Sequence, residues 1–191
     1  MNYKKFVDII KSKDIKPVYL FYGEEEYLID YTIKLVKNTF VDEALEPLNY
    51  IILEGKEIEF NHIVNACETL PFMAEKKVVV IKDLPLFKSK KELEESHVAS
   101  SKDSLINYIG GLEDYLILLF VEKTKSIRKS NPLYKQINKF GDVVEFTKLR
   151  SRDLDKWVED SFKKYNKTIS KSNINYFVQY SAYFDRNNQK T

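Results

Sequence analysis

The chain of 191 residues is poor in cysteine, glycine and proline: it has one cysteine, Cys67, and five each of the other two. A lone cysteine excludes a disulfide within the chain and any metal site built from several cysteines. So few glycines and prolines disfavour a loop-rich all-β protein or a low-complexity chain. This cysteine usage fits a reducing compartment, and we expect a cytoplasmic protein.

Long apolar runs and a strong excess of one charge are also missing. The run YLILLFV is far shorter than the roughly 20 apolar residues that span a bilayer, so no membrane partner is expected. The N-terminal segment intersperses charged with apolar residues, which is not the pattern of a signal peptide. A net charge of only +2, with 31% charged residues, disfavours a dedicated nucleic-acid coat but leaves room for a local basic patch.

What the chain does contain indicates a folded α/β protein. Hydrophobic residues make up 43% and aromatic residues 14% of the sequence. Helical patterns alternate with apolar runs, which predicts an α/β fold with a doubly wound, five-stranded, mostly parallel sheet. Continuous apolar character favours strands covered on both faces. The predicted strands are PVYLFYG, LNYIILEG, KKVVVIKD, DYLILLFVE and DVVEFTKL.

Several helices and their ends follow from the residue pattern. Asn131 and Gly141 are expected to bracket a helix that has a proline in its first turn. The polar stretch 88–103 reads as an insertion, and from about Arg150 the pattern becomes purely helical, which predicts the start of a small helical domain. After the first strand, one helical stripe is predicted from Leu28, Tyr31, Leu35, Val36 and Phe40.

The turn after the first strand has the position of a phosphate-binding loop but not its chemistry. It offers Gly23, Glu24, Glu25 and Glu26, whereas a phosphate loop needs several glycines, a lysine and a serine or threonine. Carboxylates at a helix N-terminus occupy the positive end of its dipole and repel phosphate. We therefore expect a degenerate loop that binds no nucleotide, and no cofactor.

Catalytic constellations are sparse. Asp83 follows a strand and leaves open an alternative function, a phospho-receiver or similar signalling domain with this aspartate as phosphoacceptor. Glu24 and Glu25 imitate the receiver's acidic pair poorly, and Lys148 imitates its lysine only loosely. Cys67 falls on an apolar stripe, which favours an inert buried thiol. We predict no catalytic residue and no metal site.

Two further features suggest binding. A basic stretch follows the fourth strand, and it is either a solvated face or a contact for DNA phosphates or an acidic partner. It includes Lys123, Lys125, Arg128 and Lys129. An apolar connection, Leu70, Pro71, Phe72 and Met73, lies between a helix and a strand, where short polar connections are expected. It either closes the bottom of the core or forms an exposed anchor for a partner.

Taken together, four stretches resemble the delta subunit family of bacterial DNA polymerase III in order and spacing. They are PVYLFYGEEEYLID, ACETLPFMAEKKVVVIKD, LILLFVEKTKSIRKSNPLYKQINKFGDVVEFTKL and DLDKWV. The resemblance implies a P-loop NTPase-like (AAA+-type) α/β domain over residues 1–145 and the beginning of a helical lid domain over 146–191. The family's C-terminal collar domain is then absent.

The resemblance also implies a function. Family members are non-catalytic subunits of the clamp loader, part of the DNA-directed DNA polymerase (nucleotidyltransferase) holoenzyme, and their ATPase-like domain lacks a working nucleotide site. They bind and open the sliding clamp (beta subunit), together with other clamp-loader subunits and primed DNA, during DNA replication. The matching clamp-binding element is Leu70–Met73, where Pro71 departs from a purely large-apolar pair. The basic stretch is expected to face a neighbouring subunit or DNA.

Overall fold

The computed structural model describes residues 1–191 except 56, 88–101, 151, 182 and 185–191. Most of the expected insertion at 88–103 therefore lies outside the described residues. The chain divides into two compact units, Met1–Thr147 and Lys148–Thr191. Each is described by itself below.

The first unit is built on a five-stranded parallel sheet with the order β2-β3-β4-β1-β5, which confirms the predicted fold class. Strands β1, β3 and β4 are buried along nearly their whole length, as continuous apolar sequence predicts. The same expectation is wrong for β2, an edge strand that is partly exposed. The strands are β1 (Val18–Gly23), β2 (Tyr50–Glu54), β3 (Lys77–Lys82), β4 (Leu116–Glu122) and β5 (Asp142–Phe146).

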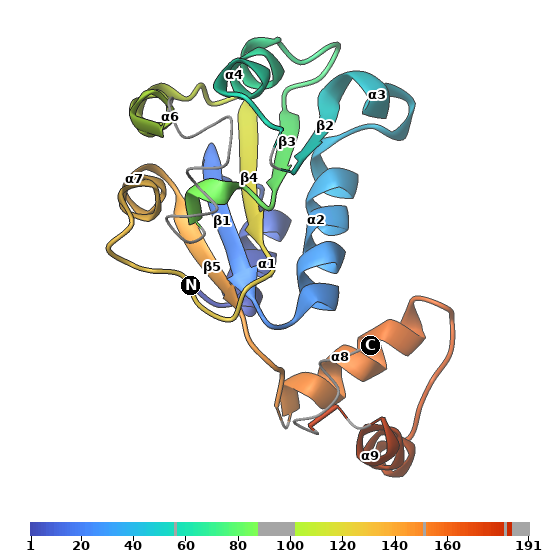
Figure 1. Ribbon diagram of the computed structural model, residues 1–191. Coiled ribbons are helices and arrows are strands. Elements are labelled where there is room, and N and C mark those ends of the chain that lie inside the picture. Colours follow the sequence, from blue (N-terminus) through green and yellow to red (C-terminus); the bar gives the residue numbers. More distant parts are fainter. Residues whose placement is uncertain (56, 88–101, 151, 182, 185–191) are drawn as a thin grey trace. The chain divides into compact units, whose positions relative to one another are not determined.

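Helices cover both faces of this sheet (Figure 1). One face carries α1 (Tyr3–Ser12) and α2 (Glu26–Phe40), and the other carries α4 (Phe60–Glu68), α6 (Lys102–Tyr108) and α7 (Pro132–Phe140). Short helical turns fill the connections: η1 (Glu43–Leu45), α3 (Glu46–Asn49), η2 (Pro85–Phe87) and η4 (Ile109–Gly111).

Local signals in the sequence placed some helices better than others. Asn131 caps α7 by accepting a hydrogen bond from the Leu133 amide, and Gly141 follows the last residue of that helix, both as predicted. The predicted stripe of α2 is wrong in part. Its buried residues are Leu28, Ile29, Thr32, Ile33 and Val36, because apolar residues lie nearly all round this helix and the sheet selects another face.

The second unit is a small helical body with α8 (Arg152–Lys163) and α9 (Lys171–Tyr180). Its core consists of Leu154, Val158 and Ile174, and Lys148 Nζ donates a hydrogen bond to the Tyr183 carbonyl at 2.8 Å. The described part of this unit contains no strand, as the helical pattern after Arg150 predicts. Among the described residues of the whole chain, no helix is both long and apolar enough to cross a membrane.

Candidate functional site

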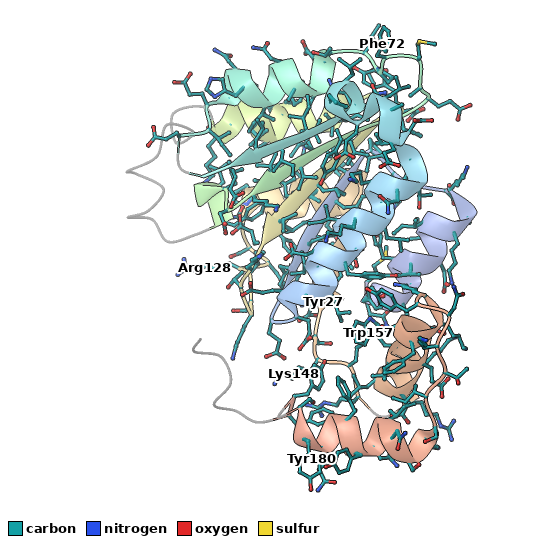
Figure 2. The ribbon with its side chains drawn as sticks, turned by 90° about the vertical axis from the view of Figure 1, so that its right-hand side faces the viewer. Tyr27, Phe72, Arg128, Lys148, Trp157 and Tyr180 are labelled. Carbon is teal, nitrogen blue, oxygen red and sulfur yellow. The ribbon has the colours of Figure 1, made fainter. Side chains whose placement is uncertain are left out.

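The two candidate sites lie at opposite ends of the sheet in the first unit. Residues Leu70–Met73, called here the apolar tip, precede β3 and so lie at the amino ends of the parallel strands. Residues Gly23–Glu26, called here the acidic turn, follow β1 at the carboxyl ends. Figure 2 shows Phe72 at one end of this unit and Tyr27 and Arg128 toward the other.

The single glycine of the acidic turn serves the sheet. Gly23 pairs with Phe146 on β5 and has a φ of +152°. A Cβ atom at this position would stand 2.1 Å from the Phe146 carbonyl oxygen, far inside van der Waals contact. The Glu25 amide also donates to that oxygen, at 3.3 Å. The close approach of two backbones therefore explains this glycine without a phosphate.

Lysines of the basic stretch neutralise the acidic turn. Lys123 Nζ lies 3.3 Å from Glu26 Oε2 and 3.4 Å from Asp30 Oδ2, and Lys125 Nζ lies 3.9 Å from Glu24 Oε2. Partial burial lowers the pKa of Lys123, but the carboxylates of Asp30 and Glu26 outweigh it and hold that pKa above its usual value. Positive charge that a phosphate would need is thus already engaged within the chain.

The four basic residues that were expected to contact a partner fall into two pairs. Lys123 and Lys125 turn to the acidic turn, whereas Arg128 and Lys129 lie on the exposed connection that precedes α7. The structure thus brings two of the four predicted contact residues into internal ion pairs. Arg128 and Lys129 are the better placed of the four to meet an external anion.

Asp83 does not stand in a receiver site. A receiver sheet has the order 2-1-3-4-5, with the first strand between the second and third, whereas β1 here lies between β4 and β5. Lys148, the loosely matched lysine, belongs to the second unit and bonds Tyr183 there. Among the described residues, no group of histidine, cysteine, aspartate and glutamate side chains could hold a metal ion. The phospho-receiver alternative is therefore not supported.

The apolar tip is exposed and is not part of the core. The exposed fraction is 70% for Leu70, 52% for Phe72 and 82% for Met73, and Pro71 is partly buried. Exposed large apolar residues that are contiguous in sequence are unusual on a protein surface and mark interaction sites. The sequence left open whether these residues close the bottom of the core or are exposed, and in the structure they are exposed.

Hydrogen bonds from a buried asparagine hold the backbone of the tip. Asn49, the last residue of α3, is fully buried. Its Nδ2 donates to the Phe72 carbonyl at 2.8 Å, and its Oδ1 accepts from the Phe72 amide at 2.7 Å. One side-chain amide thus satisfies both backbone groups of Phe72.

A second set of contacts fixes the chain just before the tip. Lys77, at the start of β3, is fully buried, and its Nζ donates to the Thr69 carbonyl at 3.0 Å. Burial lowers the pKa of this lysine. The Tyr115 hydroxyl donates to the carbonyls of Cys67 and Glu68, at 3.2 and 3.4 Å. Both side chains thus satisfy carbonyls at the end of α4 that have no partner within the helix.

Two further side chains on α4 are structural. Cys67 is buried, and burial raises the pKa of its thiol to about 12, so it is not a nucleophile. His62 belongs to a capping box, in which its Nδ1 accepts from the Glu59 amide at 3.3 Å.

Sequence reasoning did not identify the residues that hold the tip. Asn49 is one polar residue in an apolar run before β2, whereas Lys77 opens β3 directly after two other charged residues, Glu75 and Lys76. A polar residue at the start of a strand is the only signal that either position gives. Their partners lie 23 and 8 residues away, and no local pattern pairs them.

Known proteins resemble this chain in sequence. A family model described as "DNA polymerase III, delta subunit" matches residues 19–147, more than half of the chain. The DNA polymerase III subunit delta of Bacillus subtilis (strain 168) is 26% identical over 163 residues, which make up 84% of this chain and 46% of that protein.

The fold has a counterpart among solved structures. The Bacillus subtilis DNA clamp loader delta protein superposes with a TM-score of 0.75 and 23% identity, over 92% of this chain and 51% of that one. This likeness agrees with the P-loop NTPase-like fold class. The chain spans about half the length of the relatives that it matches.

Proposed function

Because the chain belongs to the family of DNA polymerase III delta subunits, we propose that it is a non-catalytic subunit of the clamp loader. In this role it binds the sliding clamp, the beta subunit, and opens the ring so that it can be loaded on primed DNA during replication. The observation that carries the proposal is the apolar tip, which exposes Leu70, Phe72 and Met73 on a backbone held by hydrogen bonds.

The tip has the properties of a binding hot spot. A half-exposed phenylalanine has apolar surface left to bury, and an aromatic anchor that fills a pocket contributes about 2 kcal/mol or more, roughly thirtyfold in affinity. Pro71 fixes its own φ, and Asn49 fixes the backbone of Phe72. A tip that is already shaped loses less entropy when it docks.

Opening a ring with this tip needs no chemistry in this chain. If the tip binds the open clamp more tightly than the closed clamp, binding alone shifts the population toward the open form. ATP hydrolysis is then the task of partner subunits, which expose or mask the tip. In this proposal the chain belongs to the DNA-directed DNA polymerase holoenzyme, a nucleotidyltransferase assembly, and acts in the cytoplasm.

The two units correspond to parts of that assembly. We assign Met1–Thr147 to the ATPase-like domain and Lys148–Thr191 to the beginning of the helical lid domain. Arg128 and Lys129, exposed at the carboxyl end of the sheet, are proposed to contact DNA or a neighbouring subunit. Unchanged clamp loading after charge reversal at both residues would contradict this last assignment.

The variant Phe72→Ala tests the role of the tip. We expect it to bind the sliding clamp of the same organism at least tenfold more weakly than wild type in a calorimetric titration. Its thermal unfolding should change little, because half of the side chain is already in water. A core phenylalanine would instead lose about 3–5 kcal/mol of stability on truncation.

Tyr27 offers a matched control for this test. It is another exposed aromatic residue of the first unit, but it lies beside the acidic turn at the opposite end (Figure 2). We expect Tyr27→Ala to bind the clamp as wild type does. Equal losses in the two variants, or normal binding by Phe72→Ala, would contradict the assignment of the tip.

A further inference from the structure

The backbone of Phe72 is held by one side chain that comes from a distant part of the fold. Asn49 ends α3 and leads directly into β2, which pairs with β3 from Tyr50 and Val78 onward. Asn49 thus lies at the amino end of β2. From there its side-chain amide reaches Phe72, in the connection between α4 and β3. Figure 1 shows α3 and this connection at the same end of the sheet.

Side-chain packing cannot hold an anchor that must stay exposed. Core residues are fixed by the atoms around them, whereas Phe72 leaves half of its surface in water. What remains to fix it is its backbone, and both polar groups of that backbone bond Asn49, at 2.7 and 2.8 Å. The next residue, Met73, has a φ of +49°, a conformation that costs free energy unless its surroundings impose it.

The connection between α4 and β3 is held at two points, and the first of these points does not involve Asn49. Lys77 Nζ holds the Thr69 carbonyl, so the chain is fixed at Thr69 and again at Phe72. Without Asn49, the residues between Thr69 and the start of β3 would be fixed only at their two ends, and the backbone of Phe72 between them would lose both of its bonds. The direction in which Phe72 points would then vary, while α4 and β3 would stay in place.

We infer that Asn49 is a positioning residue for clamp binding, which presents Phe72 to the partner by holding its backbone. This inference rests on the proposed function of the apolar tip. Asn49 is fully buried, so in this inference its side chain does not touch the clamp. Its contribution to affinity therefore acts entirely through Phe72.

The experiment is a double-mutant cycle on the full chain with Asn49→Ala, Phe72→Ala and the double variant. Affinity for the sliding clamp of the same organism is measured by calorimetric titration. We expect Asn49→Ala to weaken binding roughly tenfold when Phe72 is present, since an ordering cost returns to the binding step. In the Phe72→Ala background the same change should have no further effect.

Amide hydrogen exchange supplies a readout that does not depend on the clamp. The Phe72 amide donates to Asn49 Oδ1, so its exchange should be slow in wild type and much faster in Asn49→Ala. The Lys77 amide, which donates to the Tyr115 carbonyl in the sheet, should stay protected. Loss of protection at both amides would mean that Asn49 supports the fold in general, and would overturn the inference.

Asn131 is a matched control with the same chemistry. Its Nδ2 donates to the Leu86 carbonyl and its Oδ1 accepts from the Leu133 amide, each at 2.8 Å, at a site remote in sequence from the tip. Asn131→Ala should lower the melting temperature and leave clamp affinity unchanged. If Asn49→Ala fails to fold, Asn49→Asp, which has the same shape but cannot donate to the Phe72 carbonyl, is expected to show the weaker binding.

The outcomes separate the inference from the proposal beneath it. Weak binding by Phe72→Ala with normal binding by Asn49→Ala, or by Asn49→Asp in its place, would overturn the inference alone. An equal loss from Asn49→Ala in both backgrounds would do the same, because the effect would not pass through Phe72. Normal binding by Phe72→Ala would overturn the proposed function, and the role of Asn49 in binding with it.

Discussion

The apolar tip and the acidic turn lie at opposite ends of one sheet. They differ in whether their side chains are exposed or paired within the chain. At the tip, hydrogen bonds fix the backbone while Leu70, Phe72 and Met73 remain in water. At the acidic turn, charged side chains form ion pairs within the chain: Glu24 pairs with Lys125, and Glu26 pairs with Lys123. One end leaves its apolar side chains exposed, and the other pairs its charged side chains within the chain.

This difference shows which parts of the acidic turn the fold itself requires. The sheet, the turn after β1 and helix α2 need each other for packing, and Gly23 is fixed by the backbone of β5. The residues after Gly23 in the acidic turn can therefore change without disturbing this packing. The tip is different, because its side chains are exposed and add little to the core, and in the proposed function a partner buries them.

The largest expected effect on stability comes from adding a Cβ atom at Gly23. Gly23→Ala puts a Cβ 2.1 Å from the Phe146 carbonyl oxygen, and we expect a loss of about 3 kcal/mol or more in the free energy of unfolding, since backbone cannot move aside as a side chain can. Urea denaturation measures it. If the glycine served only to approach a phosphate, the loss would be small.

Gly55→Ala is the control for backbone strain in this comparison. Gly55 also has a positive φ, +101°, but a Cβ there meets nothing within 4 Å. We expect a cost of about 1 kcal/mol from conformation alone. Equal losses of stability at Gly23 and Gly55 would show that the cost of Gly23→Ala comes from the positive φ and not from the contact with β5.

A smaller effect is expected at Cys67, in the buried base of the tip. Its thiol has a pKa of about 12 in the fold against an ordinary 9.0, because of burial. Between these values the unfolded chain releases a proton that the folded chain keeps, so the free energy of unfolding falls by about 1.4 kcal/mol per pH unit as pH rises. Cys67→Ala lacks this proton and should lose stability less steeply.

The measurement is urea denaturation of both proteins at several pH values from 8 to 10.5. Tyrosines with raised pKa values that do not interact with Cys67, such as Tyr19 and Tyr22, contribute to both proteins and cancel in the difference. The pKa values of Tyr108 and Tyr115 are raised in part by Cys67, so their contributions differ between the two proteins. Parallel pH slopes would mean that Cys67 is accessible in the fold. The base of the tip would then be looser than its burial indicates.

The sequence predicted the fold well where a local signal exists. Five apolar runs gave five strands, and Asn131 and Gly141 marked the ends of α7. The face of α2 was missed, because its apolar residues permit more than one stripe and only the sheet selects between them. The partial exposure of β2 was missed as well, since position at the edge is a property of strand order.

The candidate sites were predictable as segments but not as networks. The apolar character of Leu70–Met73 and the carboxylates after Gly23 are visible in the sequence. The partners of these segments are not, because Asn49 and Lys123 reach them from positions distant along the chain. Ion pairing between the acidic turn and the basic stretch therefore emerges only when β1 and β4 lie side by side.

The smallest expected effect is at the acidic turn: titration with Mg-ATP should give no measurable binding heat. A phosphate that approached the start of α2 would meet Glu24, Glu25 and Glu26, and the nearby Lys123 and Lys125 are already paired. Isothermal calorimetry on the full chain checks this. Micromolar affinity would break the comparison, since both ends of the sheet would then bind outside partners.

A double variant, Glu24→Gln with Glu25→Gln, separates the two reasons for this absence. The substitutions remove two negative charges and leave side chains of the same size, so repulsion falls while the shape of the turn stays. We expect no ATP binding here either, because one glycine exposes too few backbone N–H groups and no lysine or hydroxyl follows it within the turn. Binding by this variant would mean that charge alone closes the site. The missing donors would then be of secondary importance, and the acidic turn would differ from a working phosphate loop by its carboxylates only.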